Sequence, residues 1–152
     1  MNKKTLILCL LIPLLIGGLS GFLTMDSTIL YQDLNRPPFS PPNWLFPVVW
    51  TILYLLMGLS SYLIVQSYSS NKEKALILYG FQLLVNFIWP LFFFNLQNYF
   101  LALLILIILI ISVIYMLYTF KEINIKAFYL NIPYLLWLIF AFYLNFMIFL
   151  NN

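Results

Sequence analysis

The stretch from Arg36 to Gly58, "RPPFSPPNWLFPVVWTILYLLMG", decides how this chain folds. Five of the eight prolines fall in its first dozen residues, and the remainder is an almost unbroken apolar run. A membrane-spanning helix needs about 20 mostly apolar residues, and the run from Trp44 to Ser67 is long enough. Because proline restricts its own backbone and that of the preceding residue, a stiff segment leads into this predicted membrane helix.

The composition extends this conclusion to the whole chain. Its 152 residues are 64% hydrophobic and 7% charged, whereas a soluble domain carries roughly 25% charged residues. The chain is therefore predicted to be an integral membrane protein. Its net charge of +3 comes from scattered residues, and no Lys/Arg cluster could neutralise a phosphate backbone. We expect the lipid bilayer as a partner and no nucleic acid.

Five segments are long and apolar enough to span the bilayer, so we predict an all-α bundle of five transmembrane helices. The bundle forms a single domain over residues 1–152, and we expect the charged residues to lie outside the spans. The fourth span is almost purely aliphatic, and we expect it to face lipid. The predicted spans are Thr5–Met25, Trp44–Ser67, Ala75–Leu96, Tyr99–Phe120 and Ala127–Leu150.

The positive charges are distributed unevenly over the predicted connections. Six lysines lie in the N-terminus and in the second and fourth connections, and the opposite side holds only Arg36. Cytoplasmic loops carry an excess of Lys and Arg. We therefore predict a multi-pass protein of a bacterial cell membrane, with its N-terminus in the cytoplasm and the proline-rich loop outside.

Several kinds of chemistry lack the residues that they need. The chain has no histidine and one cysteine, Cys9, so a Cys/His zinc site and a His-ligated haem are excluded. No Asp, Glu, Lys or Arg falls inside a predicted span, whereas ion-coupled pumps place ionisable groups at membrane depth. We predict no metal site, no required cofactor and no conventional acid–base catalysis.

Polar and aromatic residues recur at helical spacing in three of the spans. Hydrocarbon offers no hydrogen-bond partner, so Asn86 and Asn145 should face the interior of the bundle, where they could also simply hold helices together. Each of these three spans carries such residues on one helix face: in the second span Phe46, Trp50, Tyr54, Gly58 and Ser61; in the third Gln82, Asn86, Trp89 and Phe93; and in the fifth Pro133, Trp137, Ala141 and Asn145.

The four tryptophans divide into two groups. Trp44 begins its span and fits the aromatic belt at a membrane interface. Trp50, Trp89 and Trp137 lie deeper and indicate either a lined cavity or dense aromatic packing. Pro90 should kink the third span beside Trp89.

Small residues in the first span indicate a close helix contact. Gly17 and Gly21 have the GxxxG spacing, which lets two helix backbones approach closely. The contact could lie within the bundle or between two copies of the chain.

The loop of about eighteen residues between the first two spans is too long for a simple connection. Its prolines stiffen it, and a stiff lid loses little entropy when it closes on a ligand. The residues thus favour a receptor for a flat, apolar ligand with few polar groups.

The segments "RPPFSPPNWLFPVVWTILYLLMG", "VNFIWPLFFF" and "PYLLWLIFAFYLN" closely resemble the TspO/MBR family, the tryptophan-rich sensory and translocator proteins formerly called peripheral-type benzodiazepine receptors. The resemblance implies a homodimer of five-helix protomers that binds protoporphyrin IX or similar flat lipophiles as ligand or substrate. It implies a ligand site formed by Tyr31, Pro41, Phe46, Trp50, Tyr54, Asn86, Trp89, Trp137, Ala141 and Leu144.

Two functions follow from the resemblance. The first is a porphyrin receptor or sensor that also promotes light- and oxygen-dependent porphyrin degradation, with Trp50 and Trp137 as the catalytic residues. The alternative is a small transporter of porphyrins or other lipophiles. Apart from the resemblance, a membrane scaffold whose cavity is incidental is a third alternative. The sequence departs from the cholesterol motif of animal members, because no basic residue follows Tyr143.

Overall fold

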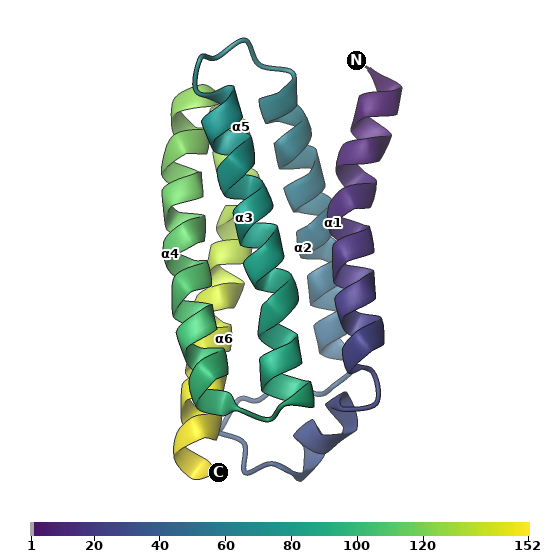
Figure 1. Ribbon diagram of the computed structural model, residues 1–152, viewed down its shortest axis with the longest axis vertical. Helices are drawn as coiled ribbons and strands as arrows, with labels where there is room; N and C mark the ends of the chain where they lie inside the picture. Colours follow the sequence, from purple (N-terminus) through teal and green to yellow (C-terminus); the bar gives the residue numbers. More distant parts are fainter. Residues whose placement is uncertain (1) are drawn as a thin grey trace.

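The computed structural model describes residues 2–152 and shows an elongated helical bundle (Figure 1). Five helices are long and apolar enough to cross a membrane, which confirms the predicted number of spans. Each end lies within three residues of its expected position. The elements are α1 (Lys3–Thr24), the 3-10 helix η1 (Thr28–Asp33), α2 (Leu45–Val65), α3 (Lys72–Pro90), the π-helix η2 (Leu91–Asn95), α4 (Tyr99–Ile123), α5 (Ile125–Leu130) and α6 (Ile132–Asn151).

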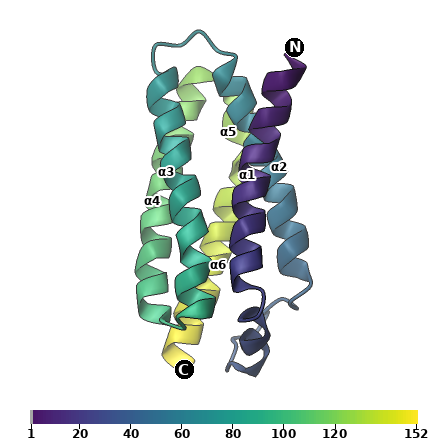
Figure 2. The same cartoon turned by 45° about the vertical axis from the view of Figure 1, so that its right-hand side comes forward.

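The helices alternate in direction along the bundle (Figures 1 and 2). Helix α1 packs mainly on α2, α3 on α4, and α4 on α6. The N-terminus and the α2–α3 and α4–α5 connections lie at one end, while η1, the proline-rich loop and the C-terminus lie at the other. The six lysines therefore share one end, and the membrane side that this end faces stays a prediction.

Two sequence expectations about the spans need correction. Lys72, Lys74, Lys121 and Lys126 lie inside terminal turns of helices rather than in connections, because the helices extend beyond the apolar segments. Helix α4 does not simply face lipid: one face is buried against α3 and α6, with Leu106 and Val113 fully enclosed. Aliphatic side chains suit lipid and protein surroundings equally well, so composition alone does not distinguish them.

Two spans are interrupted, and only the first interruption, at Pro90, was predicted from the sequence. Helix α3 ends at Pro90 and continues directly as the π-helix η2, consistent with the loss of a backbone donor at proline. The fifth span breaks at Asn131, which separates α5 from α6. The Asn131 side chain is fully buried and donates to the Ser60 hydroxyl, at 2.6 Å, and to the Ala127 carbonyl, at 3.1 Å. This bond ties the break to α2.

Glycines allow α1 and α2 to approach closely. A Cβ atom on Gly58 would lie 2.6 Å from the carbonyl oxygen of Cys9, and one on Gly17 would collide with the Tyr54 ring. Gly21, in contrast, has nothing near its Cβ position. Within the GxxxG pair, only Gly17 therefore serves the helix contact inside the bundle.

Gly58→Ala should lower the thermal unfolding midpoint in detergent, because its new methyl group meets backbone atoms that cannot move aside. Gly80→Ala is the matched control, since its Cβ position is open and alanine favours a helix over glycine by about 1 kcal/mol. We expect the control to melt at or above the wild-type temperature. Equal midpoints for the two variants would contradict the proposed close contact.

Candidate functional site

A cavity of about 450 Å³ lies between α1, α2 and α3 at the end of the bundle that carries the proline-rich loop. Its volume falls within the range of about 300–1,000 Å³ found for small-molecule sites. Most of its lining is apolar. Six of the ten residues predicted for the ligand site line it: Tyr31, Phe46, Trp50, Tyr54, Asn86 and Trp89.

The lid comprises η1 and the proline-rich loop that follows it (Figure 1). Tyr31 of η1 is buried, and its ring meets Phe46 edge-on at a centroid distance of 5.4 Å. The Arg36 guanidinium lies 4.8 Å from the centre of the Tyr31 ring, within the range of a cation–π contact. The Tyr143 hydroxyl of α6 donates to the Pro38 carbonyl at 3.1 Å. The contacts with Phe46 and Tyr143 hold the lid against the bundle, and the contact between Arg36 and Tyr31 joins two parts of the lid.

One wall of the cavity is formed by aromatic rings of α2, with an aromatic ring of α6 behind them. Trp50 stacks on Tyr54 with ring centroids 5.5 Å apart, and both rings line the cavity. Trp137 lies behind Trp50, perpendicular to it at 6.5 Å. The indole of Trp50 is therefore available to a ligand, while that of Trp137 supports it.

A second, much smaller recess adjoins this wall, with a volume of about 20 Å³. Trp137, Ala141 and Leu144 line this recess and not the larger cavity. The sequence allowed either a lined cavity or dense aromatic packing around the deeper tryptophans. Both occur: Trp50 faces a cavity, and Trp137 lies in dense aromatic packing. Pro41 is buried in the lid but lines neither space.

A chain of buried hydrogen bonds closes the cavity on the side away from the lid. The Tyr54 hydroxyl donates to Asn86 Oδ1 at 2.8 Å, and Asn86 Nδ2 donates to the Tyr134 hydroxyl at 2.8 Å. The Tyr134 hydroxyl donates in turn to Gln82 Oε1 at 2.6 Å. Asn86 thus faces the interior as predicted, and it links three helices.

Tyr134 and Gln82 are not among the predicted site residues, although they complete this polar layer. Gln82 precedes Asn86 by one helical turn, and that spacing is a detectable signal. Tyr134 carries no such signal, because an isolated tyrosine near a helix start resembles an interfacial one. The prediction for Asn145 is also confirmed: it is buried and accepts a hydrogen bond from the Trp89 indole at 3.0 Å.

Two polar atoms of the lid region lack protein partners within residues 2–152. They are the hydroxyl of Tyr31 and the Oδ1 atom of Asn43, both buried, in residues that line the cavity. Burial raises the pKa of the Tyr31 hydroxyl, against a smaller opposing effect of Arg36. Tyr31 is therefore neutral at physiological pH and can donate a hydrogen bond to a ligand.

The cavity reaches the molecular surface between α1 and α2. Gly18, Gly21, Pro47 and Thr51 line it and are all exposed. The two helices that flank this opening are both long and apolar enough to cross a membrane.

A multi-pass helical membrane protein with an aromatic cavity beneath a lid is the class that this fold and site define. A sequence model of the TspO/MBR family matches residues 9–150. The tryptophan-rich protein TspO of Archaeoglobus fulgidus is 38% identical over 100% of this chain and 99% of its own length. The tryptophan-rich sensory protein of Cereibacter sphaeroides is 35% identical over 76% of this chain and 72% of its own.

The similarity extends to animal proteins. The translocator protein of Bos taurus is 32% identical over 91% of this chain and 86% of its own length. The chain therefore belongs to the TspO/MBR family, as its motifs indicate.

Proposed function

We propose that this protein is a membrane receptor that senses porphyrins, with protoporphyrin IX as the expected ligand. The observation that carries the proposal is the cavity of about 450 Å³ walled by Trp50 and Tyr54. Its apolar lining suits a flat ring system, and the unpartnered Tyr31 hydroxyl and Asn43 Oδ1 offer hydrogen bonds to peripheral polar groups. The name of the relative from Cereibacter sphaeroides, a sensory protein, supports a sensing role.

A transporter of lipophiles is the second candidate, supported by the name of the Bos taurus relative, a translocator protein. The hydrogen-bonded layer from Tyr54 to Gln82 favours the receptor, because it closes the cavity toward the lysine-rich end. A transport cycle would have to open this layer and leave several buried polar groups unpaired. Homodimer formation is a further part of the proposal and rests on the family resemblance.

Protoporphyrin IX should quench the tryptophan fluorescence of the purified protein saturably and at a ratio of one ligand per chain. Trp50 and Trp89 line the cavity and Trp137 lies behind Trp50, so three of the four indoles are close to a bound ligand. Fluorescence titration in detergent checks this expectation. Linear, unsaturated quenching would contradict a specific site. Vectorial uptake of porphyrin by sealed vesicles would favour the transporter.

The proposed orientation places the lid outside the cell, because six lysines gather at the opposite end. A cysteine introduced at exposed Phe39, in a Cys9→Ser background, should react with an impermeant maleimide added to intact cells. Phe39 is 88% exposed, so its position is accessible to a reagent in water. Labelling that occurs only after cells are opened would reverse the orientation.

A further inference from the structure

A cation and a phenol meet on the outer surface of α3 and α4, near the lysine-rich end of the bundle. Lys74 Nζ of α3 lies 5.0 Å from the centre of the Tyr115 ring of α4, within the range of a cation–π contact. Both side chains are exposed, and the two helices pack on each other. The Lys74–Tyr115 pair therefore presents an ammonium group and a hydroxyl together at the surface of the bundle.

The end of the bundle that carries this pair is positively charged. It holds six lysines against two acidic residues, Glu73 and Glu122, which leaves a net charge of +4. The opposite end holds Arg36, Asp26 and Asp33 and has a net charge of −1. The charge of the protein therefore attracts an anion to the end where the Lys74–Tyr115 pair lies.

Two rows of exposed apolar side chains lead from the pair toward the middle of the membrane-spanning helices. Each row begins one helical turn from the pair, and successive members are three or four residues apart, so each row follows one helix face. The rows are Ile77 and Phe81 on α3, and Ile111, Ile108 and Leu104 on α4. The pair and the two rows together form a patch with a charged head and two apolar tracks.

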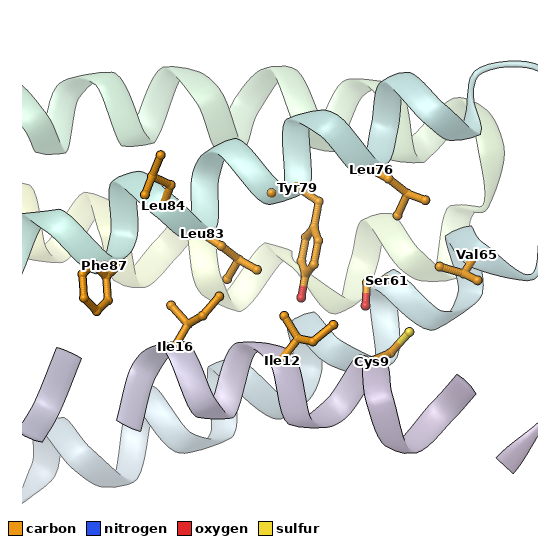
Figure 3. A pocket seen from close by; sticks show the side chains of 11 residues that line it. Cys9, Ile12, Ile16, Ser61, Val65, Leu76, Tyr79, Leu83, Leu84 and Phe87 are labelled. Carbon is orange, nitrogen blue, oxygen red and sulfur yellow. The ribbon is translucent and has the colours of Figure 1, made fainter. Parts of the chain in front are cut away.

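The α3 row is separate from the face that α3 turns toward α1 (Figure 3). Tyr79, Leu83 and Phe87 line a groove of about 380 Å³ between these two helices, whereas Ile77 and Phe81 do not line it. The α3 row therefore lies outside the groove, on an exposed face of a membrane-spanning helix.

We propose that this patch binds one anionic phospholipid, with its phosphate at the Lys74–Tyr115 pair and its two acyl chains along the two rows. The ammonium group and the tyrosine hydroxyl are hydrogen-bond donors, and hydrogen bonds between a cation and a phosphate are stronger than neutral ones. The apolar rows favour a lipid over a soluble anion or an acidic protein segment, because either of these would leave the rows uncovered. The inference goes beyond porphyrin binding and does not depend on it.

The test compares two photoreactive phospholipids, phosphatidylglycerol and phosphatidylcholine, which have the same acyl chains with a diazirine in one of them. The purified protein is reconstituted in nanodiscs of neutral lipid with a small fraction of one probe and is then illuminated. Cross-links are mapped by mass spectrometry. Phosphatidylglycerol should label the two rows about fivefold more, since one basic residue near the surface contributes about 1 kcal/mol to the attraction of an anionic lipid.

Four variants distinguish a site from a general effect of charge. Lys74→Gln changes an exposed side chain, so the protein should stay folded, and phosphatidylglycerol labelling should fall to the phosphatidylcholine level. Lys74→Arg keeps the charge and should retain the preference. Tyr115→Phe keeps the ring and removes the hydroxyl, which should give an intermediate preference. Lys126→Gln is the matched control, because it makes the same change at an exposed lysine of the same end but outside the patch. It should leave labelling of the rows unchanged.

Several outcomes would overturn the proposal. Equal labelling of the rows by the two probes in the wild type would show that the headgroup charge does not matter. An equal loss in Lys74→Gln and Lys126→Gln would assign the preference to the whole positive end rather than to the patch. A preference that excess soluble glycerol phosphate abolishes would identify a free phosphate as the ligand. Rows that neither probe labels would be covered by a second copy of the chain or by another protein.

Discussion

Gly21→Leu is expected to weaken protoporphyrin IX binding by about tenfold or more. Gly21 lines the aromatic cavity at its rim, and its Cβ position has no heavy atom within 4 Å. A leucine there can extend into the cavity without displacing the protein, so the cost falls on the ligand. Overpacking a filled site costs about 1–3 kcal/mol, and one tenfold change in affinity corresponds to about 1.4 kcal/mol.

Gly80→Leu is the matched control for this measurement. It makes the same chemical change at an equally open helical glycine, but Gly80 lies outside the aromatic cavity. Both variants replace glycine by a better helix former, so neither should unfold the protein. Titration by tryptophan fluorescence should give the wild-type affinity for Gly80→Leu and the weakened one for Gly21→Leu. A folded Gly21→Leu protein with wild-type affinity would place the porphyrin outside this cavity.

The span pattern could be predicted because apolar length is a local property of the sequence. The contacts of each helix face were less predictable from the sequence. The central part of α4 consists mostly of aliphatic residues, yet Val113 is fully buried and Ile111 is exposed. Only packing against α3 and α6 distinguishes them.

Site residues could be predicted where exposure of the side chain to lipid would cost free energy. Asn86 and Asn145 had to find partners, and both are buried and hydrogen-bonded. Trp50 and Trp137 look alike in sequence, but Trp50 lines a cavity and Trp137 supports it from behind. Pro41 lines neither space. The sequence indicates that Pro41 stiffens the backbone of the lid, but it does not indicate the direction in which the proline ring points.

Porphyrin breakdown by this protein, measured as loss of porphyrin absorbance, is expected to require both light and oxygen. The porphyrin would absorb the light and oxygen would act as the oxidant. The protein's own contribution would be the orientation of the ring and the nearby oxidisable indoles. Trp50→Phe and Trp137→Phe should each abolish the protein-dependent decay, because phenylalanine keeps an apolar ring but removes the indole.

The structure gives the two variants different expected effects on binding. Trp50 lines the cavity, so Trp50→Phe should weaken binding somewhat, though less than it reduces decay. Trp137 lies behind it at 6.5 Å, so Trp137→Phe should leave binding close to that of the wild type. Trp44→Phe is the matched control, because Trp44 is 66% exposed and lies outside the cavity.

Comparing these proteins in light and in darkness, alongside their binding curves, separates a chemical role from a packing role. If Trp137 only supports the position of Trp50, its phenylalanine variant would change decay and affinity in parallel. If the pair of indoles takes part in the oxidation, decay is lost while affinity is retained.

Equal decay in the wild type and both variants would reject a role for the indoles. The absence of decay in the illuminated wild type would leave a receptor that binds porphyrin without altering it. The perpendicular contact between the indoles favours the second outcome, because an oxidised Trp50 has a second electron-rich ring directly behind it.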